Sequence, residues 1–148
     1  MVVLVALIVG WIGFKALTTD DPDSSVKTVD YEQVVPAAKR TAPFDLVAPA
    51  SLPDGWRATS VNFSDGAPAA WHLGVLTDRD RYVGLEQADR SVRKMLVEHV
   101  DEAPTRGQPL EVEGVRWATY SDGGGDRALV RRDSGTTTLV GQISTSAW

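Results

Sequence analysis

The sequence predicts an α+β domain behind an N-terminal transmembrane helix. Three observations support this fold class. The chain begins with an uncharged apolar run, two later stretches carry apolar residues at helical spacing, and six or seven short segments alternate in polarity between turn residues. The expected order after the first run is helix, three strands, helix, three or four strands. Helices set against an antiparallel sheet define the α+β class, so we expect one antiparallel sheet of six to seven strands packed with two helices.

Length and composition limit the possible functions. The chain has 148 residues, and about 120 of them remain after the apolar run and its flank, which is enough for one domain with its own core. The net charge is −5 with acidic and basic residues interspersed, so we expect no nucleic-acid partner. The chain contains no cysteine, which excludes disulfides, thiol nucleophiles and thiolate metal ligands.

The apolar run Met1–Phe14 predicts a membrane anchor. Lys15 can extend its charge towards the interface, and Ala16 and Leu17 bring Met1–Leu17 to about the lower limit of 17 residues for a membrane-spanning helix. No small-residue cleavage site follows, so the segment is expected to stay as an uncleaved signal anchor. Alternatives are a buried core helix, or a start further upstream that would supply the missing basic residues.

The domain boundaries follow from this interpretation: residues 1–18 as transmembrane anchor, 19–29 as flexible linker and 30–148 as an extracytoplasmic α+β domain. By the positive-inside rule, Lys15 weakly favours a cytoplasmic location for the C-terminal side of the run, which carries the domain. The usual signal-anchor arrangement is the opposite one and places the bulk of the chain outside. We expect this second orientation.

The first helix is predicted to begin at Asp30, whose side chain would cap it in a box with Gln33. An apolar stripe at helical spacing follows, made of Tyr31, Val34, Val35 and Ala38. Pro36 either kinks this helix or marks the start of its regular part. Further along, Phe44–Val47 suggests a short edge strand, and Leu52–Trp56 contains the Pro-Asp-Gly pattern of a turn.

The remaining elements are a meander, a second helix and a final group of strands. The meander is predicted at Arg57–Phe63, Ala70–Thr77 and Tyr82–Gln87. Asp89 would cap a helix reaching about Val100, with Val92, Met95, Leu96 and His99 on its inner side and Lys94 paired with Glu98 outside. After a loop at Pro104–Pro109, the final strands are expected at Leu110–Val112, Val115–Tyr120, Ala128–Arg132 and Thr136–Ile143.

Several of these segments resemble a known family. The residues concerned are Trp56–Val61, Ala70–Gly74, Tyr82–Gln87, the Leu-Pro-x-Gly-Trp turn at Leu52–Trp56 and the later pair Gly114 and Trp117. As a set they resemble family 4245 among the domains of unknown function, which is actinobacterial, and the resemblance covers most of the chain. It implies a membrane-anchored envelope protein and brings no known reaction and no accepted catalytic residues.

The only pair suited to acid–base chemistry is His72 with Glu86. If an odd number of residues connects their strands, the antiparallel register places the two side chains together on one face. With an even number, His72 faces Gln87 instead. Such a pair could serve in general acid–base catalysis, although a structural polar pair at the rim of a sheet has the same sequence pattern.

Other candidate sites have simpler explanations. Asp122–Asp126 contains three glycines and lacks the ligand alternation of an EF-hand, so a hairpin turn is expected there and no metal site. Three tryptophans could line a ligand groove or fill the core. The candidate groove is therefore Trp56, Trp71, His72, Glu86 and Trp117. We expect no cofactor and no catalytic residue.

The sequence as a whole predicts a single-pass envelope protein that acts as a non-catalytic binding or accessory module. Its ligand or partner would be another envelope protein, a wall polymer or a lipid. The alternatives are a subunit of a membrane assembly, or a hydrolase that uses His72 and Glu86.

Overall fold

The computed structural model describes residues 27–143. The predicted anchor, most of the predicted linker and the last five residues lie outside this range. Within residues 27–143, no helix is both long enough and apolar enough to cross a membrane. At the end of the predicted linker, the backbone N–H of Val29 donates a hydrogen bond of 2.8 Å to the carbonyl oxygen of Ala58 in the sheet.

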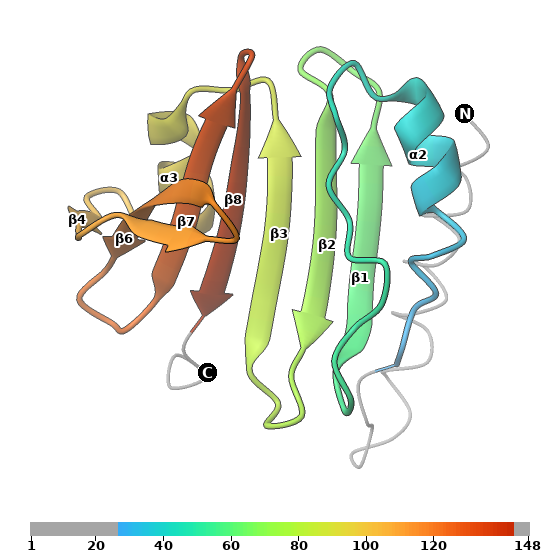
Figure 1. The fold of residues 1–148 in the computed structure, drawn as a ribbon, viewed down its shortest axis with the longest axis horizontal. Helices are drawn as coiled ribbons and strands as arrows, with labels where there is room; N and C mark the ends of the chain where they lie inside the picture. Colours follow the sequence, from blue (N-terminus) through green and yellow to red (C-terminus); the bar gives the residue numbers. More distant parts are fainter. Residues whose placement is uncertain (1–26, 144–148) are drawn as a thin grey trace.

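The described residues form two helices and eight strands, in an α+β arrangement (Figure 1). The helices are α2 (Val35–Thr41) and α3 (Val92–His99). The strands are β1 (Arg57–Ser64), β2 (Ala70–Leu76), β3 (Tyr82–Ala88), β4 (Thr105–Arg106), β5 (Leu110–Val112), β6 (Val115–Ser121), β7 (Arg127–Asp133) and β8 (Thr136–Ile143). All seven strands predicted around the two helices are present to within a residue or so at each end.

All strand pairs are antiparallel, and the sheet has the order β1-β2-β3-β8-β7-β6-β4, with β5 also pairing with β6. The sheet has eight strands, one more than the upper end of the predicted six to seven. The additional strand is β4, which lies inside the segment Pro104–Pro109 that was expected to be a loop. This strand consists of two residues, Thr105 and Arg106, which pair with Ser121 and Tyr120 of β6. A strand of two residues is too short to show the alternation by which strands are predicted.

The sheet has two faces, which we name after adjacent residues of β2. The Trp71 face carries the side chains of Trp71, Leu73 and Val75, and the His72 face carries those of the residues that alternate with them. Opposite residues of paired strands share a face. The three strands β1, β2 and β3 form one half of the sheet, and β8, β7 and β6 form the other half.

The N-terminal segment covers the Trp71 face over β1, β2 and β3. Its contacts form one core cluster with the sheet, containing Tyr31, Ala38, Leu46, Ala58, Phe63, Trp71, Leu73 and Val75. The helix α2 begins later than predicted, since Val34 is its N-cap and Pro36 lies in its first turn, where a missing N–H costs least. The side chains of Asp30 and Gln33 still meet, at 2.8 Å, but they do so ahead of the helix.

The predicted edge strand at Phe44–Val47 is absent, and side chains of the sheet explain why. The backbone N–H of Val47 donates to Gln87 Oε1 at 2.7 Å, and its carbonyl oxygen accepts the Trp71 indole N–H at 3.0 Å. The Gln87 amide also donates to the carbonyl oxygen of Asp45 at 3.2 Å. The backbone of this segment is thus satisfied by two side chains beneath it rather than by a neighbouring strand.

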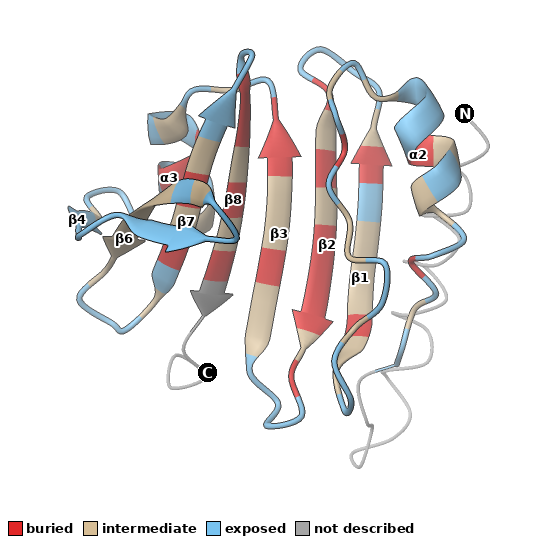
Figure 2. Cartoon of the chain, in the orientation of Figure 1, coloured by how far each residue is buried: buried red, intermediate tan, exposed pale blue. Residues whose placement is uncertain are grey.

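The second helix, α3, covers the opposite face and the opposite half of the sheet. Met95 and Leu96 are buried there with Ala88, Ala128, Val130 and Leu139, as the predicted inner side of this helix requires. Ser91 rather than Asp89 is the N-cap, accepting the N–H of Lys94. Asp89 instead accepts the hydroxyl of Thr136 at 2.7 Å. Glu98 pairs with Arg90 and not with Lys94 as predicted. Figure 2 shows the buried residues along the central strands.

Candidate functional site

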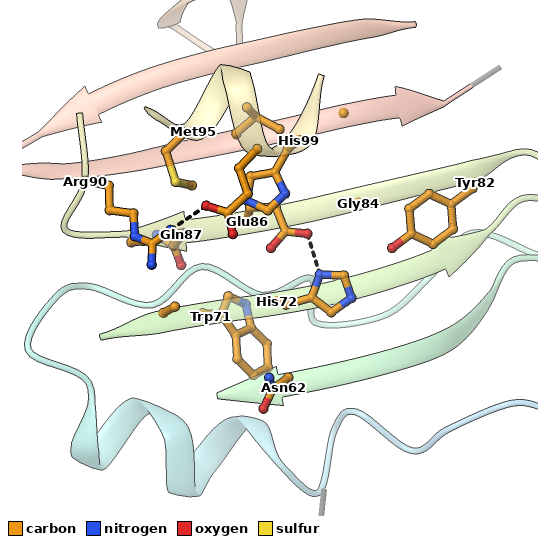
Figure 3. Close-up of a pocket in the computed structure, with 15 residues that line it drawn as sticks. Asn62, Trp71, His72, Tyr82, Gly84, Glu86, Gln87, Arg90, Met95 and His99 are labelled. Atoms are coloured by element: carbon orange, nitrogen blue, oxygen red, sulfur yellow. Dashed lines mark hydrogen bonds and ion pairs between the residues drawn. The ribbon is translucent and has the colours of Figure 1, made fainter. Parts of the chain in front are cut away.

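Residues 27–143 cover each face of the sheet over one half only, and they leave the His72 face open over β1, β2 and β3. A cleft of about 460 Å³ lies there, beside α3. Its lining includes Asn62 from β1, His72 from β2, Tyr82 and Glu86 from β3, and Arg90 at the start of the α3 region. Figure 3 shows these side chains on the open surface between the strands and α3.

His72 and Glu86 are brought together as the odd-numbered connection predicts. They are directly opposite in the register between β2 and β3. The Nδ1 atom of His72 is paired with Glu86 Oε1 (Figure 3). The His72 side chain is 28% exposed and that of Glu86 13% exposed. The pair is therefore half-buried on a cleft wall, with the imidazole reachable from solvent.

The other ring nitrogen of His72 contacts a serine that the sequence analysis did not single out. Ser60 Oγ lies 2.7 Å from His72 Nε2. Ser60 is on β1, where a bulge between Ala58 and Ser60 shifts the register, so that Ser60 pairs with Gly74 instead of the expected neighbour. No pattern in the sequence predicts a bulge, and a serine in a strand does not by itself indicate a site. The contact between Ser60 and His72 could therefore not be predicted.

A row of glycines runs across the sheet next to these polar residues. Gly74, Gly84 and Gly141 are paired in succession on β2, β3 and β8, and Ser60 pairs with Gly74 at one end of the row. The ring of Tyr82 lies over the first two. A Cβ built on Gly74 would lie 2.9 Å from Tyr82 Cε2, and one on Gly84 would lie 3.3 Å from Cε1. The glycines thus make room for the ring, as in aromatic rescue of strand glycines.

The Tyr82 hydroxyl reaches the same space as Ser60. A Cβ on Gly74 would lie 2.5 Å from the Tyr82 hydroxyl oxygen and closer still to Ser60 Oγ. Burial raises the pKa of Tyr82 above 10, a hydrogen bond with Ser60 lowers it, and the nearby Glu86 carboxylate raises it further, with a net upward shift. The phenol is therefore protonated at neutral pH and can act as a hydrogen-bond donor.

The wall of the cleft on the α3 side carries charges that are already paired. Arg90 Nη1 is bonded to Glu98 Oε2. Thr137, which is fully buried, donates its hydroxyl to the carbonyl oxygen of Arg90 at 2.6 Å and fixes the start of this region on β8. Met95, His99 and Leu139 complete this side. Within residues 27–143, no three His, Asp or Glu side chains gather as ligands of a metal ion.

The three tryptophans of the candidate groove do not gather with His72 and Glu86. Trp71 contributes to the floor of the cleft, but it is only 1% exposed and its indole bonds to Val47 over the opposite face. Trp56 packs against the core cluster beneath the N-terminal segment. Trp117, on β6, lines a separate depression with Phe44 and Arg131.

The glycine-rich segment Asp122–Asp126 is the turn of the hairpin between β6 and β7, as predicted. Asp122 Oδ1 accepts the backbone N–H groups of Gly124 at 2.9 Å and Asp126 at 2.8 Å. The carboxylate thus closes the turn in the manner of an Asx-turn.

Comparison with known proteins places the chain in one family. No curated protein and no solved structure matches it. The family model described as "Protein of unknown function (DUF4245)" matches residues 1–146, which is nearly the whole chain. The resemblance noted at Trp56–Val61, Ala70–Gly74 and Tyr82–Gln87 is therefore confirmed at the level of the family, and the chain belongs to DUF4245.

Proposed function

We propose that this protein is a single-pass, membrane-anchored envelope module that binds a polar ligand in the cleft on the His72 face. The observation that carries the proposal is the half-buried pair of His72 and Glu86 on the wall of an open cleft of about 460 Å³. Ligand sites combine a concave surface with a few convergent polar groups, and this cleft has both features.

The charges of the cleft favour an uncharged, hydroxyl-rich ligand over an anion. Arg90 is neutralised by Glu98, and His72 is engaged by Glu86. Asn62 and Glu86 still offer hydrogen-bond acceptors, and Tyr82 offers an aromatic ring at the other end. A glycan segment of a wall polymer presents hydroxyl groups and apolar ring faces that match such a surface, and binding it requires no bond to be broken.

Binding can be tested with the full chain in mild detergent and a panel of soluble oligosaccharides released from bacterial cell walls. The readout is the dissociation constant from titration calorimetry. Glu86→Gln and Asn62→Ala should weaken binding at least tenfold, because each removes an acceptor or donor from the wall. Glu111→Gln is the matched control, since this exposed carboxylate lies on β5, away from the cleft. The proposal fails if no oligosaccharide binds, or if all three variants bind equally.

Membrane location and orientation are part of the same proposal. The support for a membrane anchor is the apolar run Met1–Leu17, which an acidic flank follows. The proposed orientation places Asp20 to Trp148 outside the cell. Protease added to intact spheroplasts that express the full chain should digest the domain and leave a cytoplasmic marker protein intact. Protection of the domain until the membrane is broken would reverse the orientation.

A second candidate function, a subunit of a membrane assembly, is favoured by the other open half of the sheet. The Trp71 face over β8, β7 and β6 carries a depression of about 670 Å³. Its lining combines apolar residues, among them Leu110, Leu129 and Val140, with polar ones such as Thr119 and Arg127. Leu110 is 47% exposed. Crosslinking in the native membrane from a photoreactive residue at position 110 would identify a partner. A single monomer species with no crosslinked product would exclude this candidate.

A further inference from the structure

The hydrogen bonds of His72 form a chain with a defined direction. The Glu86 carboxylate can only accept, so His72 Nδ1 carries the proton of the bond between them. In the neutral imidazole this leaves Nε2 without a proton, as an acceptor. Ser60 Oγ, 2.7 Å from Nε2, is then the donor. The carboxylate, imidazole and hydroxyl come from three adjacent strands, β3, β2 and β1.

This order of atoms is the one that activates a serine hydroxyl for attack on a carbonyl group. A carboxylate at Nδ1 fixes the tautomer and the orientation of the ring, and Nε2 removes the proton of the serine as its oxygen attacks. We propose that Ser60 is a nucleophile, that His72 is its general base, and that Glu86 positions the imidazole. This proposal goes beyond ligand binding, and the substrate class is a carboxylic ester.

The covalent step balances within the cleft and water. Ser60 Oγ forms a bond to the acyl carbon, and its proton passes to His72 Nε2. As the bond between the acyl carbon and the leaving oxygen breaks, Nε2 delivers this proton to the leaving alcohol. A water molecule then attacks the acyl-serine with His72 again as base, which releases the carboxylic acid and restores the Ser60 hydroxyl. No oxidant, reductant or metal ion takes part.

Tyr82 supplies a hydrogen-bond donor where negative charge would develop. Its hydroxyl lies with Ser60 Oγ around the space above Gly74, where a side chain of any size would collide with both. Its raised pKa keeps the phenol protonated at neutral pH. A donor held next to the attacked carbonyl stabilises the oxyanion of the tetrahedral intermediate.

The surroundings of Ser60 limit the direction from which an ester can approach. Tyr82, His72 and Glu86 line the cleft, and Ser60 adjoins it through its contact with His72. The space directly above Gly74 is already filled, because a Cβ there would lie 2.2 Å from Ser60 Oγ and 2.5 Å from the Tyr82 hydroxyl oxygen. The ester must therefore approach Ser60 from the cleft and not from above Gly74.

The test is covalent labelling of the full chain in mild detergent with a small fluorophosphonate, followed by intact mass measurement and peptide mapping. We expect one phosphonyl group per chain, on Ser60. Ser60→Ala should lose this label. His72→Gln and Glu86→Gln should slow it at least tenfold, because the first removes the base and the second weakens its orientation. Ser64→Ala is the matched control, since Ser64 is on the same strand and face but bonds only to the backbone N–H of Gly66; its labelling should equal that of the parent.

Two results would overturn the proposal. One is a parent chain in which Ser60 reacts no faster than Ser64. The other is labelling of Ser60 that His72→Gln leaves unchanged. The outcome is independent of the binding proposal, since Ser60→Ala should keep its affinity for the oligosaccharide panel. Hydrolysis of p-nitrophenyl acetate gives a second measurement, in which Ser60→Ala should fall to the background rate of the buffer.

Discussion

The two open surfaces of this sheet differ in chemistry, although each lies opposite a helix-covered half. The His72 face over β1, β2 and β3 presents Asn62, His72 and Glu86. The Trp71 face over the other half presents Leu129 and Val140. The first surface thus centres on a pair of ionisable side chains, whereas the second mixes apolar residues with polar ones such as Thr119 and Arg127. Each hydrogen bond on such a surface typically contributes about 0.5–1.5 kcal/mol to stability, which is less than the burial of a large core side chain contributes.

The largest expected effect falls on the core beneath the N-terminal segment. Trp71→Ala should lower the free energy of unfolding by about 3–5 kcal/mol, because it leaves a cavity and removes the indole bond to Val47. Chemical denaturation of the detergent-solubilised chain measures this loss. His72→Ala, one residue away on the open face, is the comparison and should cost much less. Similar losses for both variants would show that the polar face carries as much of the stability as the core.

Met95→Ala probes the second core cluster. Met95 is 1% exposed between α3 and the sheet, and its truncation should cost about 2–5 kcal/mol. The same denaturation experiment applies, with Val97→Ala as control, since Val97 lies on the outer side of α3 and is exposed. A loss below that of the Val97 variant would mean that α3 is only loosely attached.

Gly74→Ala tests the close packing beneath Tyr82. The added methyl group would collide with Ser60 Oγ and the Tyr82 hydroxyl, so one of the two must move. We expect a loss of about 1–3 kcal/mol in unfolding free energy, typical of overpacking. Gly84→Ala should cost less, since the nearest atom to its Cβ is 3.3 Å away. Equal thermal midpoints for Gly74→Ala and the parent would show that the ring of Tyr82 moves freely.

Tyr82→Phe should change the alkaline stability of the domain. Because the pKa of Tyr82 is raised in the folded state, the folded chain holds this proton more tightly than the unfolded chain. The contribution of this protonated phenol to the free energy of unfolding is fully present below pH 10, and it is lost as the pH rises from 10 through the folded-state pKa. The parent should therefore lose more stability than the variant as the pH rises above 10, as measured by urea denaturation. Parallel curves would place the phenol in solvent.

The smallest change in unfolding free energy is expected at Leu110, on the open half of the Trp71 face. Leu110→Ser removes an exposed side chain of β5 and should change the unfolding free energy by no more than about 0.5 kcal/mol. A loss above about 1 kcal/mol would instead show that Leu110 packs firmly over the depression. Comparison with Trp71→Ala then separates residues that hold the fold from residues available to a partner.

The sequence predicted the local elements well and the long-range connections poorly. The strands were found because their apolar alternation is dictated by burial on one face, as at Trp71, Leu73 and Val75. The register of His72 with Glu86 followed from counting residues between two strands. The conformation of Phe44–Val47 could not be predicted, because it depends on Gln87 and Trp71, about 25 to 40 positions away.

The site was predicted only in part for a similar reason. His72 and Glu86 are chemically distinctive, and they could be found by residue type. Ser60 acquires its place from a bulge, and Tyr82 from two glycines, Gly74 and Gly84, that meet only when β2 and β3 are paired. The spacing of Gly74, Gly84 and Gly141 carries no signal until the strand order is known. The sequence left two positions open for the tryptophans, because an aromatic residue in a strand has the same pattern whether it fills a core or lines a groove.

The two edges of the sheet bear on how this domain meets other molecules. On β1, the bulge after Ala58 interrupts the ladder, and Val29 already occupies the carbonyl of Ala58. At the other edge, β4 is two residues long and lies between Pro104 and Pro109. The neighbouring strand β5 is three residues long and begins directly after Pro109. Among the described residues, the shortness of β4 and β5 limits strand addition at their edge, and the bulge and the bond to Val29 limit it at the Ala58 end of β1. At the edge formed by β4 and β5, a partner is therefore expected to dock on a face of the sheet and not to extend it.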